Sequence, residues 1–293
     1  FADEGVRRIL KLMLPALFAV SVTQINLLLD TVLASFLVAG SISWLYYSER
    51  LMEFPLGLLG VALGTVLLPK LSRERAQDDP QRFRRTLDWG LRTALTFGLP
   101  AAVGLAVLAG PMIATLFLSD VFTAEDVRMA RLSLMAYSSG LMAFILIKVL
   151  APAYYAQQDT RTPVRIGVIA MAANMVFNLI LIFPLQHAGL ALATSLSAYL
   201  NAWLLWRGLQ RAGTYQAGPG WGRLAGQVFL AGAAMGGVLW VGAADLGAWL
   251  EQDAWLRAAR LVGWIALGAG VYFAALLALG WRPSALLKGV DRH

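Results

Sequence analysis

The sequence predicts an all-α fold, a polytopic transmembrane bundle of about eight helices, and three observations support it. First, 59% of the 293 residues are hydrophobic and only 14% are charged, whereas soluble domains have roughly 25% charged residues. Second, the apolar runs have the length of a membrane-crossing helix, about 20 residues, and differ from the short alternating segments of a membrane β-barrel. Third, the basic residues are concentrated in alternate connections, a bias that an odd number of spans would scramble.

Four apolar segments form the first part of the predicted bundle. The first carries Asp30, its only carboxylate within the apolar stretch, together with several uncharged polar residues, so it is too polar to face lipid on all sides. The second and third contain prolines and glycines, which permit bends or close packing. These spans are predicted at about residues 6–36, 41–71, 86–118 and 124–155.

A linker divides the rest of the chain. Pro163 suits the first turn of a helix and begins the fifth span. A stretch rich in glycine and proline then separates six spans from two additional ones. The later spans are predicted at about 163–183, 189–209, 224–243 and 260–280, which gives a six-helix unit (1–212), a linker (213–222) and two further helices (223–293).

The distribution of lysine and arginine predicts the orientation. With the N-terminus in the cytoplasm, eighteen basic residues fall on the cytoplasmic side and four on the other. This asymmetry follows the positive-inside rule and places both ends of the chain in the cytoplasm. The net charge of +7 therefore reflects topology and lipid head groups, and we expect no nucleic-acid partner.

Several classes of function lack support in the sequence. There is no cysteine, and two histidines are too few for a histidine-rich metal site. The H-E-x-x-H, G-x-x-x-x-G-K-[ST] and G-x-S-x-G motifs are absent. The first residues do not form a signal peptide, so we expect the chain to start inside a longer protein. We expect a transporter rather than an enzyme, without a cofactor other than an ion.

Four charged residues are candidates for substrate binding. Arg50 lies within the second span, where a charge is costly unless it faces a water-filled cavity or a partner. Glu49 and Glu53 are its nearest potential partners, and Glu53 shares its helix face. Arg50 either lines a cavity and binds an anion such as phosphate, or forms a structural ion pair near the outer interface. Lys148, a second cation within a span, either has a similar role or extends to the membrane surface.

A group of uncharged polar residues forms a possible Na⁺ site with one carboxylate. Asn174 and Asn178 share a face of the fifth span, Thr194 lies on the sixth, and Asp30 lies on the first. Their oxygens and a backbone carbonyl, for which we take Leu190, could bind Na⁺. The alternative is hydrogen bonding between helices, in which Asn and Thr stabilise packing.

Three segments of the chain resemble the MurJ/MviN family. They are SWLYYSERLMEFPLGLLGVALGTVLLP (43–69), which resembles the signature helix of the family, KVLAPAYYAQQDTRTPVR (148–165) and QHAGLALAT (186–194). The resemblance covers the whole chain and corresponds to helices seven to fourteen of a fourteen-helix protein. It implies the multidrug/oligosaccharidyl-lipid/polysaccharide exporter superfamily, whose members alternate between inward-open and outward-open states around a cavity between two six-helix lobes.

The resemblance also implies a function in peptidoglycan biosynthesis, cell wall biogenesis and cell shape. The substrate would be lipid II, moved from the cytoplasmic to the periplasmic leaflet of the bacterial inner membrane. Arg50 matches the cavity arginine of this lobe and would meet the pyrophosphate. The last two helices and the first helix would form a groove for the lipid tail. Asp30, Asn174, Asn178 and Thr194 match proposed Na⁺ ligands, with Asn178 at a position where a carboxylate can occur. The partner would be the missing N-terminal lobe.

Three other interpretations remain open. Another exporter of the superfamily, an O-antigen-type flippase or a cation-coupled drug antiporter, would not explain the two additional helices, and a drug antiporter would favour carboxylates over Arg50. A membrane-embedded polyprenyl-phosphate transferase would need an acidic or metal-binding cluster at a membrane face, which we do not find. A membrane scaffold without transport activity would tolerate neutralisation of Arg50.

Overall fold

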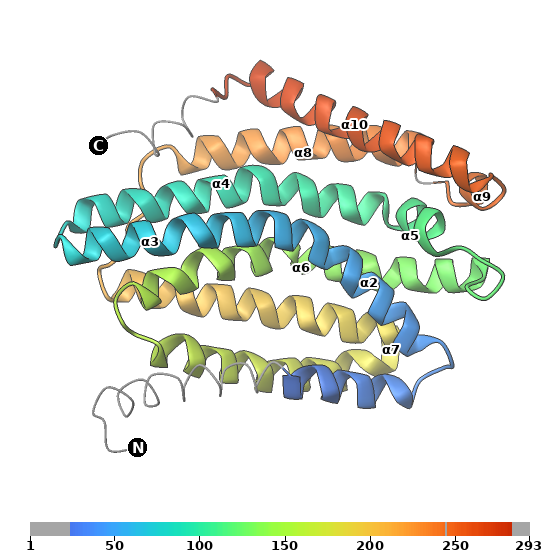
Figure 1. Cartoon of the computed structure of the whole chain (residues 1–293), viewed down its shortest axis with the longest axis horizontal. Helices are drawn as coiled ribbons and strands as arrows, with labels where there is room; N and C mark the ends of the chain where they lie inside the picture. Colours follow the sequence, from blue (N-terminus) through green and yellow to red (C-terminus); the bar gives the residue numbers. More distant parts are fainter. Residues whose placement is uncertain (1–23, 244, 283–293) are drawn as a thin grey trace.

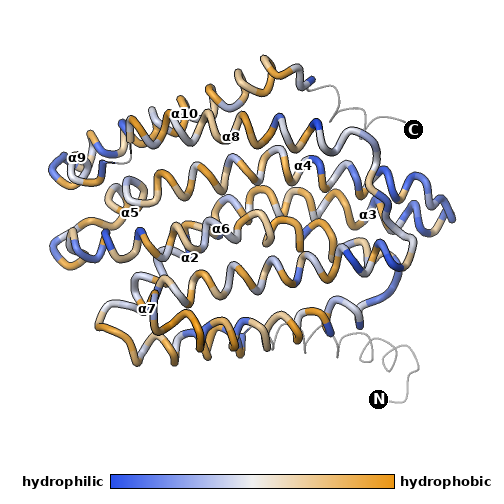
Figure 2. Tube along the Cα trace, turned by 180° about the vertical axis from the view of Figure 1, so that it is seen from behind, coloured by the Kyte–Doolittle hydropathy of each residue, from blue (hydrophilic) through white to orange (hydrophobic). Residues whose placement is uncertain are grey.

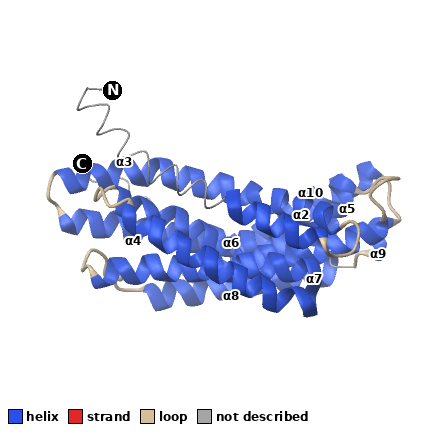
Figure 3. Cartoon of the chain, turned by 90° about the horizontal axis from the view of Figure 1, so that it is seen from below, coloured by secondary structure: helices blue, strands red, loops and turns tan. Residues whose placement is uncertain are grey.

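The computed structural model describes residues 24–243 and 245–282, and these residues form helices without any strand. The helices run along a common long axis, with connections at both ends (Figures 1 and 3). The all-α prediction is confirmed. Residues 24–35 are helical, and the elements that follow are α2 (Ser41–Leu56), the π-helix η1 (Gly57–Val61), α3 (Ala62–Ala76), α4 (Pro80–Val107), α5 (Ala109–Phe117), α6 (Ala124–Tyr155), α7 (Arg161–Arg211), α8 (Trp221–Ala243), α9 (Gly247–Leu250) and α10 (Ala254–Ala278).

Six helical segments in the described part of the chain are long and apolar enough to cross a membrane. Hydrophobic residues fill the middle of the bundle, and hydrophilic ones gather toward its ends (Figure 2). The first predicted span, 6–36, is described only from residue 24, and α7 contains two predicted spans. The six segments therefore agree with the prediction of about eight helices. They are Ser41–Ala76, Pro80–Val107, Ala124–Tyr155, Arg161–Arg211, Trp221–Ala243 and Ala254–Ala278.

The α7 segment is a helical hairpin. Its 51 residues would form a rod of about 76 Å if straight, far longer than the ~30 Å hydrocarbon core. The chain reverses at Gln186 (φ 49°, ψ −129°), shortly after Pro184, and returns beside itself (Figure 1). His187 follows the turn, is buried, and packs edge-on against Trp44 of α2 with ring centroids 4.8 Å apart. The tip of the hairpin is thus fixed to the start of α2.

The prediction of the third span as one helix over 86–118 is wrong in two respects. The helix starts earlier, and two helices, α4 and α5, take the place of one. The helix α4 begins earlier, at Pro80, after Asp79, whose side chain accepts a hydrogen bond from the backbone N–H of Arg82 at 3.0 Å. Pro80 fits there because the first helical position needs no N–H donor. The helix ends at Val107, and α5 begins at Ala109 after the single residue Leu108, while Pro100 lies inside α4 without ending it.

The second span contains a π-helical turn. Pro55 lies near the end of α2, and η1 follows directly before α3. A π-helical turn holds one residue more than an α-helical turn of similar length, and such turns occur mostly as single insertions in longer helices. The helix therefore continues through η1 with a changed angular register.

The central element of the bundle is α6, which packs against α2, α3, α4, α5 and α7. Its contact with α7 is close because both helices present small residues there. Ser195 of α7 donates a hydrogen bond from Oγ to the carbonyl of Ala136 at 2.7 Å. A Cβ added to Gly140 would lie 2.7 Å from the Cα of Ser195. Small residues at helix contacts allow this kind of backbone approach in membranes.

The additional helices α8 and α10 pack on α4 and on each other. Residues 24–35 lie on the opposite side of the bundle (Figure 1). The expected groove between the last two helices and the first helix stays a prediction, because residues 6–23 of the first span lie outside the described residues.

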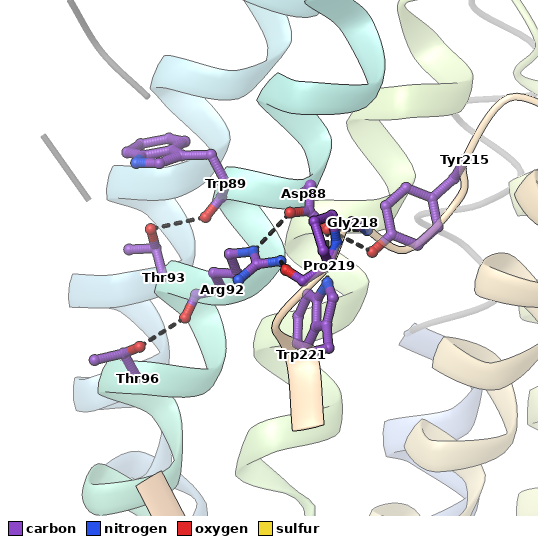
Figure 4. A network of polar contacts seen from close by, with 9 residues as sticks. All are labelled: Asp88, Trp89, Arg92, Thr93, Thr96, Tyr215, Gly218, Pro219 and Trp221. Carbon is purple, nitrogen blue, oxygen red and sulfur yellow. Dashed lines mark hydrogen bonds and ion pairs between the residues drawn. The ribbon is translucent and has the colours of Figure 1, made fainter. Parts of the chain in front are cut away.

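A network around Asp88 of α4 joins the linker to the six-helix unit (Figure 4). The side chain of Asp88 lies where α4, the linker and the start of α8 meet, so one carboxylate contacts all three. It accepts hydrogen bonds from Nε of Arg92 (2.6 Å), the hydroxyl of Tyr215 (2.9 Å), Nε1 of Trp221 (2.7 Å) and the backbone N–H of Gly218 (3.3 Å).

Arg92 reinforces this junction. Its Nη2 donates to the carbonyl of Pro219 at 2.8 Å, and its guanidinium lies 5.1 Å from the ring centroid of Trp221. Burial beside the carboxylate of Asp88 raises the pKa of the Tyr215 hydroxyl, which therefore stays a hydrogen-bond donor at neutral pH.

The approach of α6 and α7 generates the first prediction. Gly140→Ala forces the two helices apart and should lower the free energy of unfolding by about 1–3 kcal/mol. Gly167→Ala is the matched control, since no atom lies within 4 Å of its Cβ position. The thermal melting temperature of the detergent-solubilised protein measures both. Equal melting temperatures for the two variants would contradict the close contact.

The Asp88 network generates the second prediction. Asp88→Ala leaves several donors without their charged acceptor and should weaken docking of the linker by about 1.5–3 kcal/mol. Limited proteolysis of residues 212–220 should accelerate at least several-fold. Asp120→Ala, at an exposed position between α5 and α6, is the control. An unchanged cleavage rate in Asp88→Ala would mean that the linker is held by other contacts.

Candidate functional site

The side chain of Arg50 is accessible although it lies far along a membrane-crossing helix. It is about 14 Å along the axis of α2 from Ser41, and 55% of it is exposed. Its Nη1 donates to Oε2 of Glu53 at 2.6 Å, so the predicted pairing is present. Its guanidinium also lies 5.1 Å from the ring centroid of Tyr46, a residue that the sequence prediction missed. The spacing of four residues could have indicated this contact.

The geometry of Arg50 leaves room for a ligand. A guanidinium has five N–H donors, and the hydrogen bond to Glu53 uses one of its nitrogens. The side chains of Arg50 and Glu53 are both about half exposed. Glu53 can therefore orient Arg50 while other donors stay available to an anion such as a phosphate.

The other two predicted substrate-binding residues, Glu49 and Lys148, lie at different distances from Arg50. Glu49 is partly buried, and it lies close enough to Arg50, Glu53 and Asp30 for their charges to interact. Lys148 of α6 is exposed, and its side-chain stem packs on η1, where a Cβ at Gly60 would lie 3.1 Å from its Cγ. Gly60 is about 15 Å along the helix from Arg50. Lys148 thus has the geometry of a cation that extends to the surface along its stem.

The five residues of the predicted Na⁺ site come together where the first helix meets the α7 hairpin. They form a continuous chain of hydrogen bonds across three helical segments. Nδ2 of Asn178 donates to Oδ1 of Asp30 (2.6 Å) and to Oδ1 of Asn174 (3.0 Å), Nδ2 of Asn174 donates to Oγ1 of Thr194 (3.3 Å), and Oγ1 of Thr194 donates to the carbonyl of Leu190 (3.1 Å).

The residues of this cluster fit a hard monovalent cation. All candidate ligand atoms are oxygens, and Asp30 supplies one negative charge. The Oδ1 atom of Asn178 is buried without a hydrogen-bond partner, which is an unusual and costly arrangement. Half a turn of its amide would bring this oxygen toward Asp30, where a cation between them would satisfy both. The same contacts also match the alternative, an interhelical hydrogen-bond network.

Asn26 is a member of this cluster that the sequence prediction missed. Its Nδ2 donates to Oδ2 of Asp30 at 3.4 Å, and its own Oδ1 is buried without a partner. Asn26 precedes Asp30 by four residues, so the two share a helix face, and this spacing could have indicated the contact.

Comparisons with known proteins support one family. The family model described as Lipid II flippase MurJ matches residues 1–254. A probable lipid II flippase MurJ from Haemophilus influenzae is 52% identical over 291 residues, which cover 97% of this chain and 57% of that protein. The lipid II flippase MurJ of Burkholderia cenocepacia is 40% identical, over 95% of this chain and 54% of that protein.

Solved structures agree with this result. An inward closed conformation of the lipid II flippase MurJ superposes with a TM-score of 0.75 at 27% identity, over 94% of this chain and 55% of that one. An outward-facing MATE-family multidrug resistance transporter of the MOP superfamily shares the fold, with a TM-score of 0.60 at 18% identity, over 92% of this chain and 64% of that one. The chain spans a little over half the length of the curated relatives named above.

Proposed function

The chain belongs to the lipid II flippase MurJ family, and from this membership we propose that it forms one lobe of a transporter that flips lipid II across the membrane. The family and the six apolar helices make it a multi-pass protein of the bacterial inner membrane. The observation that carries the proposal is the accessible guanidinium of Arg50 on a helix that crosses the bilayer.

The physical problem of the proposed reaction is the charged head group. Moving a pyrophosphate and its sugars through ~30 Å of hydrocarbon is prohibitive without a hydrated, cationic path. Arg50, oriented by Glu53 and Tyr46, would bind the pyrophosphate partway across. The exposed face of α2 would close against a second lobe, and the head group would move when the two lobes change their angle.

We orient the lobe with the turn between α3 and α4 in the cytoplasm. That end of the bundle also contains the connection between α6 and α7 and the linker. The sequence there is dense in arginine, including Arg73, Arg75, Arg82 and Arg84, as expected for the cytoplasmic side. Both ends of the chain would then be cytoplasmic. We place the lipid tail along the exposed apolar surfaces of α8 and α10, for example at Phe229 and Val262.

We further propose that the cluster around Asp30 binds Na⁺ and couples it to the helix contacts. The ion would add a positive charge beside a carboxylate that lies within a membrane helix, and it would link the first helix to the α7 hairpin. The buried oxygen of Asn178 without a partner supports this proposal.

The function predicts loss of transport when Arg50 is neutralised. A bacterium depleted of its own flippase is complemented with the full-length protein that contains this chain. Arg50→Gln should abolish rescue, because the substitution removes the charge that offsets the pyrophosphate, while Arg50→Lys should retain part of it. Arg128→Gln is the control, since Arg128 is exposed and paired with Glu125 at 3.1 Å. Full rescue by Arg50→Gln would contradict the assigned role, and failure of the wild-type protein would contradict the proposed function.

The ion site predicts stabilisation by Na⁺. The purified full-length protein should melt at a higher temperature in sodium chloride than in choline chloride, because a ligand at ten times its dissociation constant adds about 1.4 kcal/mol. Asp30→Asn should remove this difference, whereas Asp120→Asn should keep it. Equal melting temperatures of the wild-type protein in the two salts would contradict the Na⁺ site and would mean that the cluster is a hydrogen-bond network between helices.

A further inference from the structure

A buried guanidinium without a partner lies at the start of α10, at the end of the bundle away from the linker. Arg257 is only 7% exposed. Two of its three side-chain nitrogens, Nε and Nη1, are buried and make no hydrogen bond. Burying an arginine in this way is costly unless an anion and hydrogen-bond acceptors compensate. The position therefore lacks an anionic partner.

The start of α10 is itself favourable for an anion. This helix has 25 residues, and the side chain of Asp253 at its N-cap makes no capping hydrogen bond. The first N–H groups of the helix are thus not satisfied by a side-chain cap, and they carry partial positive charge. Side chains in a helix tilt toward its N-terminus, so Arg257, in the fourth helical position, extends toward these N–H groups.

The described part of the protein does not supply the anion. Glu251 and Asp253 are exposed, and neither forms an ion pair with Arg257 within 4.0 Å. Arg260, one turn later, lies 4.8 Å from the ring centroid of Trp249. Arg128, at the same end of the bundle, already pairs with Glu125. The described residues therefore leave the position beside Arg257 open to an anion from outside them.

The surroundings indicate the lipid bilayer as its source. The neighbours of Arg257 in the first turn are Trp255, which is 87% exposed, and Leu256, which is 57% exposed. An exposed tryptophan at the end of a membrane-crossing helix is typical of the level of the lipid head groups. The phosphates of the lipids lie at this level.

Gln252, five residues before Arg257, adds a second unsatisfied polar group. Its Oε1 is also buried without a hydrogen-bond partner, directly before α10. This corner therefore lacks both an anion for Arg257 and a donor for Gln252. A phospholipid whose head group ends in an ammonium supplies both, and the exposed carboxylates of Glu251 and Asp253 favour the ammonium end.

We propose that the start of α10 binds a phospholipid with a primary ammonium head group, its phosphate at Arg257 and its ammonium at Gln252. This site lies apart from Arg50 and from the Asp30 cluster, so it does not depend on the proposed transport reaction.

The test uses the full-length protein, purified in detergent and freed of lipid. Native mass spectrometry measures binding of phosphatidylethanolamine, phosphatidylcholine and phosphatidylglycerol, and melting temperatures measure stabilisation by these lipids or by inorganic phosphate. Phosphatidylethanolamine should bind at least about tenfold more tightly than phosphatidylcholine, which has no donor in its head group. Arg257→Gln should reduce this affinity about tenfold or more, Arg257→Lys less, and Gln252→Leu should remove the preference between the two lipids. Arg128→Gln is the control and should bind as the wild type does.

Further measurements distinguish this lipid site from a structural arginine and from a site for another anion. Without lipid, Arg257→Gln should melt at the same temperature as the wild type or higher, since it removes a buried unpaired charge; a lower value would assign Arg257 a purely structural role. Equal stabilisation by inorganic phosphate would indicate a site for a free anion, and a preference for phosphatidylglycerol would indicate one for anionic lipid. Any of these three results would overturn the proposal, and so would lipid binding that Arg257→Gln leaves unchanged.

Discussion

A polar group inside hydrocarbon must find a partner within the protein, and the architecture of this chain depends on that constraint. Helices satisfy the backbone, and most buried side chains that carry oxygen or nitrogen are hydrogen-bonded between helices. Ser48 of α2 donates to the carbonyl of Ala130 in α6, and Tyr272 of α10 donates to the carbonyl of Thr96 in α4. Such bonds fix the relative rotation of neighbouring helices, which apolar contacts alone specify poorly.

Some buried polar atoms of the described residues do not satisfy this constraint. Asn178, Gln252 and Arg257 keep buried polar atoms without partners, and we propose an ion at Asn178 and a lipid head group at Gln252 and Arg257. Asn178 faces the carboxylate of Asp30 where the first helix meets the α7 hairpin, whereas Gln252 and Arg257 lie at the start of α10. Arg50 differs from all three, because its partner Glu53 is present and its exposed face stays available.

Much of the fold could be predicted because membrane-crossing helices are determined by local composition. The helix α6 has the predicted bounds, since Thr123 forms a capping box with Asp126 at its start and the apolar run ends near Tyr155. The pairing of Arg50 with Glu53 followed from their spacing. The break at Leu108 had a local signal that the prediction did not use: Pro111 cannot donate a hydrogen bond to the carbonyl of Val107, so α4 ends there and Pro111 lies in the first turn of α5. The partners of Asp88 in the linker and α8, Tyr215 and Trp221, lie more than 120 residues away in the sequence, and the burial of Arg257 arises from tertiary packing, so neither had a local signal.

The π-helical turn of η1 has a consequence for sequence length in this region. One extra residue in a helix rotates everything after it by about 100° relative to what precedes it. The residues of α3 that contact α4 and α6, such as Leu67 and Leu71, are buried in the rotated register. A single-residue deletion between Gly57 and Val61 would restore regular α-helical geometry and turn these leucines out of the core. The number of residues in η1 is therefore constrained more tightly than the types of those residues. Relatives that keep the fold should align in this region without gaps.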